Sequence, residues 1–443
     1  MVAAGKGSRL RMEEGLPKPL APLVGVPLIS RVMWGAARAG IKRFKVVAGY
    51  RADVMRRELA RLVPGGAVLE VIENPDFEGP NGVSLRMAAE ALIGSGPFVL
   101  LMSDHIFSPE RLKSALEWFR QTGRSLLVTE ALGRFQGDIA DATLVRIKGD
   151  RIEAIGKGLE SPDAIDTGMF ILRPEEAAEA LRRAGPAPSI SDGMRVLAAQ
   201  GRLDAFTMES GWWQDVDTPE DFKEAERKLY ASLRKPGDGV LAKLINRRVS
   251  VFLTKRLWPL GVTPNMVTAF TSLFGIAAGI FFAQGGAAWG LAGATAFQFQ
   301  SIIDGVDGEL ARLLQKESRS GFWFDVIADN ITHGMVFGGI AIGRIAEGRP
   351  GPWALLGVIS CLGVAASFFA FAPLLDPSRA NDSSRTRLGR VVAKLGSRDF
   401  SYLLFPLAAL GWLGEFLWVA TFGIWGYAAA AVLLRSRTRA QGR

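Results

Sequence analysis

The stretch IDGVDGELARLLQKESRSGFWFDVIADN, residues 303–330, places four aspartates beside long runs of apolar residues. Spacings of three and four residues align each pair of aspartates on one face of a helix. Two such helices, joined by a short basic turn, would bring the carboxylates together at one end of a helical bundle. This cluster is costly at a membrane unless cations compensate it. We therefore expect divalent metal ions between Asp304, Asp307, Asp325 and Asp329.

The distribution of charge divides the chain into two halves. With 443 residues, the chain exceeds one ordinary domain. Charged residues are dense up to about residue 235, whereas several stretches between 264 and 435 are almost free of charge. We therefore expect a soluble domain at residues 1–231, a linker with an interfacial amphipathic helix at 232–262, and a membrane domain at 263–443.

The net charge of +9 indicates partners that carry phosphate. Many arginines lie just outside the apolar stretches, where they would face anionic lipid headgroups, so we expect a lipid bilayer as partner and no nucleic acid. The single cysteine, Cys361, excludes an intrachain disulfide. The first ten residues, MVAAGKGSRL, lack the features of a signal peptide, so the first domain is expected in the cytoplasm.

Short apolar runs alternate with helical patterns in the first half. Strand-like runs occur at 44–50, 67–73, 98–104, 125–131 and 167–173, and PLISRVMWGAARAG and ADVMRRELARLV carry apolar residues at helical spacing. This alternation predicts a Rossmann-like α/β domain with a mainly parallel sheet. Ligands of such sheets bind beyond the carboxyl ends of the strands.

A glycine-rich segment near the start, AAGKGSRL, is followed by LPKPL. Gly5 and Gly7 let backbone amides approach a phosphate, and Lys6, Arg9 and Lys18 would neutralise a triphosphate. The alternative is an ordinary strand-to-helix turn with solvated cations. The whole string resembles the signature loop of the sugar-nucleotide and alcohol-phosphate nucleotidyltransferases.

Further segments extend this resemblance over residues 1 to about 230. In that family a phosphate oxygen attacks the α-phosphorus of a nucleoside triphosphate, while magnesium and a lysine, here Lys18, offset the developing charge. The resemblance implies recognition of base and ribose through Asn81, Gly82 and Ser84. It also implies a metal ion held by Asp104 and by Asp215 or Asp217. Asp217 could equally cap the helix that begins TPEDF.

The first domain departs from the family at its start. Family members begin with a full buried strand, but only Met1 to Ala4 precede Gly5 here. Either the start of the sequence has been placed late or the central strand is trimmed, and a trimmed central strand would weaken the nucleotide site. A nucleotide-binding or structural appendage without catalysis is therefore an alternative for this domain.

A Pro/Gly break at 232–239 precedes the second half, and residues 240–261 mix basic and apolar residues at helical spacing. An interfacial amphipathic helix is favoured over a soluble linker helix. Six transmembrane helices are expected, which gives an all-α bundle. Basic segments after the second, fourth and sixth spans place these ends on the side of the first domain. The spans lie at about 264–284, 287–312, 320–343, 352–375, 399–413 and 415–434.

The acidic string reads D-x-x-D-G-x-x-A-R, eight residues, then G-x-x-x-D-x-x-x-D, and resembles the signature of the CDP-alcohol phosphotransferases. The resemblance implies that the first three aspartates hold two Mg²⁺ ions, or Mn²⁺ in their place, on the CDP diphosphate. Asp329 would complete this site and deprotonate an acceptor hydroxyl, which attacks the β-phosphorus and expels CMP. Gly308, Ala311 and Gly321 would give the nucleotide room, and Arg312 would contact it or the carboxylates. For His333, a hydrogen-bonded place in the bundle is favoured over a catalytic role.

The fusion of the two domains is similar to that in the bifunctional inositol-1-phosphate cytidylyltransferases and di-inositol-phosphate-phosphate synthases. The segment GSRDFSYLLF at 396–405 also resembles that family. This resemblance implies CTP, inositol 1-phosphate and a CDP-alcohol as substrates. The first domain would make the CDP-alcohol, and the second domain would consume it. It also implies a homodimer through the membrane domain. The alternative is a phospholipid synthase that uses CDP-diacylglycerol, with a different cytidylyltransferase or a non-catalytic appendage in front.

Overall fold

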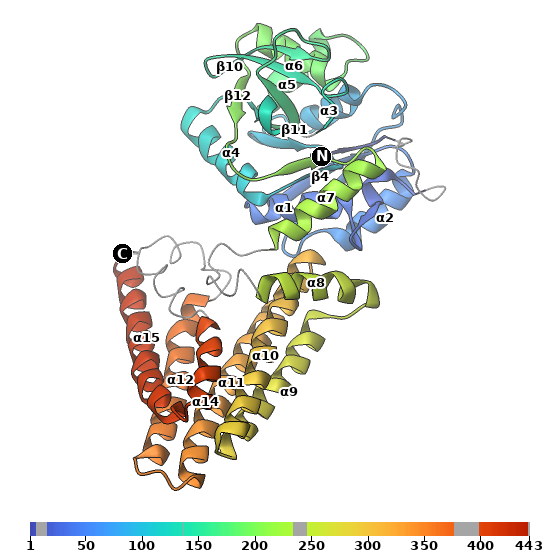
Figure 1. The fold of residues 1–443 in the computed structure, drawn as a ribbon. Coiled ribbons are helices and arrows are strands. Elements are labelled where there is room, and N and C mark those ends of the chain that lie inside the picture. The colour runs from blue at the N-terminus through green and yellow to red at the C-terminus, as the bar shows by residue number, and fades with distance from the viewer. Residues whose placement is uncertain (6–15, 136, 234–245, 376–397, 442–443) are drawn as a thin grey trace. The chain divides into compact units, whose positions relative to one another are not determined.

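The computed structural model describes residues 1–5, 16–135, 137–233, 246–375 and 398–441. The chain divides into two compact units, Met1–Leu229 and Tyr230–Arg443. The first unit is a layered α/β domain, and the second is a bundle of long helices (Figure 1).

The first unit begins with a small parallel sheet. β1 (Val2–Ala3) pairs with β4 (Arg43–Ala48), and β4 pairs with β5 (Val68–Glu73), all in parallel. An isolated parallel bridge between Val2 and Met102 continues this sheet toward the next. The strands expected at 44–50 and 67–73 are therefore confirmed.

A second sheet of six strands has the order β6-β11-β8-β12-β10-β9. The strands expected at 98–104, 125–131 and 167–173 are confirmed as β6, β8 and β11. The strand bounds are β6 Phe98–Leu101, β8 Leu126–Ala131, β9 Leu144–Lys148, β10 Arg151–Gly156, β11 Ala164–Leu172 and β12 Asp204–Thr207.

The prediction of a mainly parallel arrangement is right for the first sheet and wrong for the second. Only β8 and β12 run parallel there, whereas β11 is antiparallel to β6, β8 and β9. The physical reason is visible at β9 and β10, which are joined by Gly149 and Asp150 alone. A two-residue connection can join only antiparallel neighbours.

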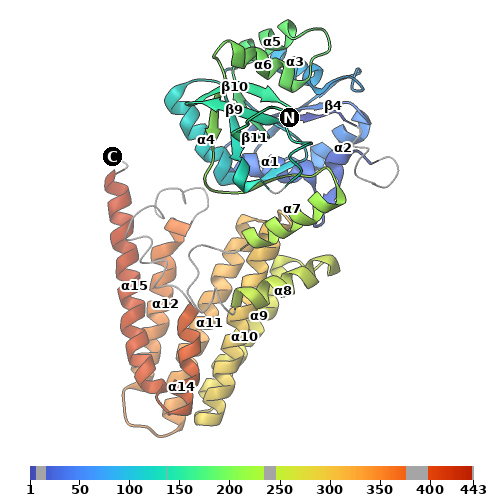
Figure 2. The same cartoon turned by 45° about the horizontal axis from the view of Figure 1, so that its top comes forward.

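Helices cover both faces of these sheets (Figures 1 and 2). On β11, Met169 and Ile171 belong to the core under α1, α2 and α4, while Phe170 and Leu172 belong to the core under α3, α5 and α6. This alternation is what the pleat of a strand buried on both faces requires. The helices are α1 Leu28–Arg38, α2 Ala52–Leu62, α3 Asn81–Glu90, α4 Pro109–Thr122, α5 Pro174–Arg183, α6 Ile190–Ala199 and α7 Pro219–Ser232.

The second unit contains the helices α8 Arg247–Leu257, α9 Pro264–Ala283, α10 Ala287–Leu313, α11 Arg319–Ala346, α12 Trp353–Leu375, α14 Leu404–Ala409 and α15 Leu413–Gln441. Among the described residues, four helices are long and apolar enough to cross a membrane: α9, α11, α12 and α15. This region is therefore membrane-associated. α8 lies within the stretch expected to form an amphipathic helix.

The structure does not reproduce six full spans. The fifth expected segment, 399–413, holds the 3₁₀ helix η6 (Arg398–Leu403) and the six-residue α14. A bilayer core needs roughly 20 residues of α-helix, so α14 is far too short to cross it. α10 has 27 residues, but its glutamines and acidic groups make it too polar to count among the four helices that could cross a membrane.

Glycines bring α9 and α11 into backbone contact. A Cβ atom on Gly339 would lie 2.2 Å from the Gly279 carbonyl oxygen, and one on Gly279 would lie 2.6 Å from the Met335 carbonyl oxygen. Small residues at such contacts are typical of membrane helix pairs. Thr263 caps α9 by accepting a hydrogen bond from the Met266 amide, and Pro264 occupies the first turn, where proline is tolerated.

Candidate active sites

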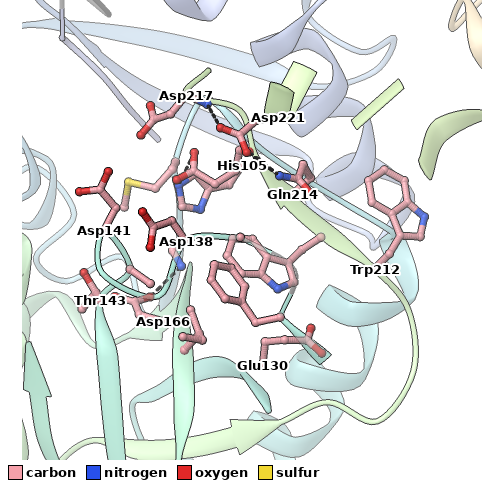
Figure 3. Close-up of a pocket in the computed structure, with 18 of the residues that line it drawn as sticks. His105, Glu130, Asp138, Asp141, Thr143, Asp166, Trp212, Gln214, Asp217 and Asp221 are labelled. Atoms are coloured by element: carbon pink, nitrogen blue, oxygen red, sulfur yellow. Dashed lines mark hydrogen bonds and ion pairs between the residues drawn. The ribbon is translucent and has the colours of Figure 1, made fainter. Parts of the chain in front are cut away.

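A cavity of about 930 Å³ opens in the first unit (Figure 3). It lies beyond β6. Its lining includes His105 of β7 (His105–Phe107), residues of β11 and β13 (Trp213–Asp215), and residues of the segments 133–143 and 217–228. Its lining includes acidic groups and an aromatic wall in which Phe135 and Trp213 stack with their centroids 6.1 Å apart. The acidic lining residues are Glu130, Asp138, Asp141, Asp166, Asp215, Asp217, Glu220 and Asp221.

Lys18, in the short helix η1 (Lys18–Leu20), contacts Asp217 of the cavity lining. Its ammonium group donates to Asp104 Oδ2 at 2.5 Å and to Asp217 Oδ1, and only 6% of the residue is exposed. Burial by itself lowers the pKa of Lys18, but the charges and hydrogen bonds of Asp104 and Asp217 outweigh burial and raise this pKa. Lys18 is therefore a fixed cation among carboxylates. Three predicted site residues, Lys18, Asp104 and Asp217, are therefore in contact in the structure.

His105 adds a nitrogen donor to the carboxylates. Its Nδ1 lies 2.7 Å from the Thr167 carbonyl oxygen, which orients Nε2 toward Asp215 Oδ1 at 3.3 Å and Asp104 Oδ1 at 4.0 Å. Burial lowers the pKa of His105, but the two carboxylates outweigh burial and raise it. Asp104, His105 and Asp215 each offer a ligand atom within 4.8 Å of the others. Two carboxylates and an imidazole suit a divalent cation such as Mg²⁺ or Mn²⁺.

Sequence reasoning missed His105, although it directly follows Asp104. The relevant signal is tertiary, because β7 and β13 pair antiparallel and place His105 opposite Asp215. Nothing in the spacing of these residues along the chain indicates that pairing.

Asp217 is engaged by Lys18 rather than by the helix that follows it. The cap of α7 is Thr218, whose hydroxyl accepts from the Asp221 amide at 3.2 Å, while Asp221 Oδ2 accepts from the Thr218 amide at 2.9 Å. This reciprocal pair is a capping box. The alternative in which Asp217 caps the helix is therefore wrong.

The residues expected to recognise base and ribose differ in their surroundings. Asn81 lines the cavity, and its Oδ1 accepts from the Ile190 amide at 3.0 Å. Ser84 is buried, and its hydroxyl accepts from Asn74 Nδ2 at 2.9 Å. Gly82 allows close packing, because a Cβ there would lie 2.4 Å from the Pro188 carbonyl oxygen.

The glycine-rich loop is described only at its start. Gly5 is exposed, and a Cβ atom there would meet no atom within 4 Å among the described residues. Lys6, Gly7 and Arg9 lie outside the described residues.

The second candidate site lies between α10 and α11. Asp304 and Asp307 of α10 and Asp325 of α11 each offer a carboxylate oxygen within 4.8 Å of the others. Three carboxylates this close repel one another when ionised, and oxygen donors are what Mg²⁺ and Mn²⁺ prefer. Asp329 is outside this group of three and lies one turn further along α11, half-buried.

Neighbouring side chains hold these carboxylates in place. Asp307 is buried and accepts from Thr268 Oγ1 of α9 at 2.6 Å. Asp304 Oδ1 accepts from Gln300 Nε2 at 3.4 Å, one turn earlier on α10. Sequence reasoning missed Thr268 and Gln300, since nothing in their own spacing marks them as partners of the acidic string.

The remaining residues of the signature lie around the two aspartate pairs. A Cβ on Gly308 would lie 3.2 Å from Arg312 Nη1, and one on Gly321 would lie 2.9 Å from Ser318 Oγ. Arg312 Nη2 donates to the Leu233 carbonyl oxygen at 3.3 Å, and Ala311 is half-buried.

His333 is packed as a bundle histidine. Its Nδ1 lies 2.8 Å from the Asp329 carbonyl oxygen, one turn back. Its ring lies 6.1 Å from the ring of Phe297, 6.3 Å from Phe337 and 6.2 Å from Phe400. These contacts favour the structural interpretation of this residue.

Comparison with known proteins gives matches to both units. Residues 1–203 match the family model of the MobA-like NTP transferase domain, and residues 261–425 match that of the CDP-alcohol phosphatidyltransferases. A solved inositol-1-phosphate CTP transferase from T. maritima is 25% identical, with a TM-score of 0.46, over 51% of this chain and 92% of that one.

Full-length relatives match most of the chain. The bifunctional IPC transferase and DIPP synthase of Thermococcus kodakarensis is 33% identical over 82% of this chain and 79% of its own length. The protein of the same name from Rubrobacter xylanophilus is 35% identical over 77% of this chain and 76% of its own length. The chain therefore belongs to the family of bifunctional IPC transferases and DIPP synthases, enzymes that join a nucleotidyltransferase domain to a CDP-alcohol phosphotransferase domain.

Proposed function

We propose that the two units catalyse consecutive reactions. The first joins CTP and inositol 1-phosphate to give CDP-inositol and pyrophosphate. The second transfers the phosphoinositol group of CDP-inositol to a second inositol 1-phosphate, releasing CMP and giving di-myo-inositol phosphate phosphate. The observation that carries this proposal is that one chain holds two separate acidic centres, one with a buried lysine in a cavity and one between two apolar helices.

In the first reaction, Lys18 stabilises negative charge at the α-phosphorus of CTP. A phosphate oxygen of inositol 1-phosphate forms a bond to this phosphorus, the bond to the bridging oxygen breaks, and pyrophosphate leaves. Asp104, His105 and Asp215 would hold Mg²⁺, or Mn²⁺ in its place, which when bound supplies further charge neutralisation. Because Lys18 is already fixed by Asp104 and Asp217, little reorganisation is needed as charge develops.

The cavity suits a polyol next to the nucleotide. Asp138, Asp141 and Asp166 line it and offer acceptors for hydroxyl groups, while Phe135 and Trp213 give an apolar wall for the face of a ring. Burial raises the pKa of Asp166 to about 6, and its Oδ1 accepts from the Gly168 amide at 2.7 Å. We propose that base and ribose lie near Asn81 and the loop that begins at Gly5.

In the second reaction, Asp329 takes the proton of the acceptor hydroxyl. The acceptor oxygen forms a bond to the β-phosphorus of CDP-inositol, and the bond from that phosphorus to the CMP oxygen breaks. Asp304, Asp307 and Asp325 would hold Mg²⁺ or Mn²⁺, which when bound stabilises the diphosphate charge. Gly308, Ala311, Gly321 and Arg312 form the surroundings in which the nucleotide would bind.

The membrane arrangement is part of this proposal. We propose that the bundle is embedded in the cell membrane, with α8 in the interface and both active sites on the cytoplasmic side. The basic segments that flank alternate spans support this orientation. A homodimer through the membrane domain is proposed from the family resemblance.

The test uses the full chain in membranes with CTP, Mg²⁺ and labelled inositol 1-phosphate, followed by mass spectrometry and ³¹P NMR. We expect CDP-inositol first and the phosphodiester product later. Asp325→Asn should accumulate CDP-inositol, and Asp104→Asn should block synthesis from CTP but not from supplied CDP-inositol. A lipid product, or phosphodiester formed by Asp325→Asn at the normal rate, would contradict the proposal.

A further inference from the structure

Glu309 has no part in the proposed chemistry, yet its carboxylate is fully buried and hydrogen-bonded. It directly follows Gly308 in the acidic string and is 0% exposed. Its carboxylate accepts from Arg247 Nη1 at 2.8 Å, from Ser250 Oγ at 2.7 Å and from Thr254 Oγ1 at 2.7 Å. All three donors belong to α8, so one side chain of α10 joins two turns of that helix.

α8 crosses α10 beside the aspartates. Gly305 lies four residues before Glu309, on the same helix face, and a Cβ atom on Gly305 would lie 3.5 Å from Ser250 Cβ. Two residues of helix correspond to a turn of about 200°, so Asp307 points away from Glu309. Asp307 indeed bonds to Thr268 of α9.

α10 is therefore held from two sides. On one side α9 bonds to Asp307, and on the other α8 bonds to Glu309. A buried carboxylate with three donors, one of them charged, has a strongly preferred geometry, because any rotation of α10 would leave buried polar groups unpaired. Such a rotation would also turn Asp304 and Asp307 away from Asp325.

We propose that Glu309 is a positioning residue of the phosphotransferase site. By anchoring α8 on α10, it fixes the rotation of α10 and thereby aims Asp304 and Asp307 at Asp325. This inference rests on the proposed metal site of the second unit. It makes the seating of an amphipathic helix a condition for forming that site.

The first test measures metal binding directly. The full chain in lipid nanodiscs, carrying Asp104→Asn to weaken the first centre, is titrated with Mn²⁺ and followed by electron paramagnetic resonance. CMP release from supplied CDP-inositol is measured against Mg²⁺ concentration in parallel. Glu309→Gln should raise the half-saturating metal concentration about 10- to 100-fold, the range found when groups that orient metal ligands are removed. Glu309→Ala should raise it further, because the glutamine side chain can still accept from Ser250 through its oxygen and donate to Thr254 Oγ1 through its nitrogen.

The chain offers a matched control at a distance. The buried Arg344 and the half-buried Glu347 also form an ion pair, at 2.7 Å, and Glu347 lies about 27 Å from Asp329 along the direction of α11. Glu347→Gln should lower thermal stability without changing the half-saturating metal concentration. If Glu309→Gln behaves in the same way, Glu309 only stabilises the fold and the inference is wrong. If the parent chain neither binds Mn²⁺ nor releases CMP, the proposed function fails instead.

A disulfide separates positioning from any direct role of the carboxylate. Cysteines at 250 and 305 would have Cβ atoms about 3.5 Å apart, within the range of disulfides. The variant carries Ser250→Cys, Gly305→Cys, Cys361→Ser and Glu309→Gln. We expect the reduced variant to bind Mn²⁺ weakly. The oxidised variant should regain at least half of the lost Mn²⁺ affinity, measured on a logarithmic scale. Equal affinities in both redox states, with the crosslink verified by mass spectrometry, would overturn the inference.

Discussion

His105 and Asp215 face each other as paired residues of β7 and β13, and His105 Nε2 lies 3.3 Å from Asp215 Oδ1. Lys18 lies on the other side of Asp104 and binds it and Asp217. The carboxylates of this centre therefore divide into two sets: Asp215 faces the histidine, Asp217 faces the lysine, and Asp104 faces both. Substitutions in the two sets should have different effects.

Replacing Lys18 by methionine should abolish the reaction that consumes CTP. The substitution removes the buried cation that offsets charge at the α-phosphorus, so pyrophosphate release should fall about 100- to 1000-fold. Lys18→Arg should recover part of the rate. CMP release from supplied CDP-inositol is the internal control and should stay unchanged. A fall of less than about fivefold in pyrophosphate release would contradict the proposed role of Lys18 in the first reaction.

Replacing Asp166 by asparagine should flatten the dependence of stability on pH. Burial raises the pKa of Asp166 from 3.8 to about 6, so the folded chain binds a proton more tightly than the unfolded chain. The free energy of unfolding therefore falls as the pH rises from 3.8 through about 6, by at most about 3 kcal/mol. Melting curves of the full chain at pH 4.5 and 7.5 should differ less for Asp166→Asn than for the parent. An unchanged difference would show that Asp166 titrates normally.

Replacing Thr268 by valine should weaken the second reaction. The substitution keeps the shape of the side chain but removes the hydroxyl that donates to Asp307 at 2.6 Å. We expect CMP release to fall about tenfold, with a higher requirement for Mg²⁺. Thr271→Val is the matched control, since the buried Thr271 hydroxyl donates to the backbone carbonyl of Thr268 at 3.0 Å. Equal effects of the two substitutions would deny Thr268 a specific role.

Replacing His333 by phenylalanine should leave the second reaction within about threefold of the parent rate, because a ring that packs among Phe297, Phe337 and Phe400 can be exchanged for a similar one. CMP release and thermal stability are measured on the same preparation. Loss of CMP release at unchanged stability would instead indicate a chemical role for the imidazole.

The acidic string could be interpreted from sequence because its geometry is local. Spacings of three and four residues place Asp304 beside Asp307 on one helix, and the short turn brings Asp325 close to both. Five strands of the first unit, β4, β5, β6, β8 and β11, were predicted in the same way, since each is an apolar run, whereas β9, β10 and β12 were not predicted.

Features that depend on tertiary pairing could not be found in this way. His105 joins the first centre through strand pairing. The capping box of Thr218 and Asp221 is local instead, and its spacing in TPED is visible in the sequence, which indicates Thr218 rather than Asp217 as the cap of α7. The direction of β11 follows from its neighbours and not from its own residues. In the second unit, apolar composition predicted a span at 399–413, but the chain there forms a short α-helix after a 3₁₀ turn.

The seam between α9 and α11 is closed at Gly339 and Gly279, whose backbones are in contact, so among the described residues no gap wide enough for an acyl chain or a polyol opens at that point. This point lies about 21 Å along α11 from Asp325, so it closes the bundle away from the acidic centre. Bulky side chains in place of those two glycines would force the helices apart and should allow water to enter between them.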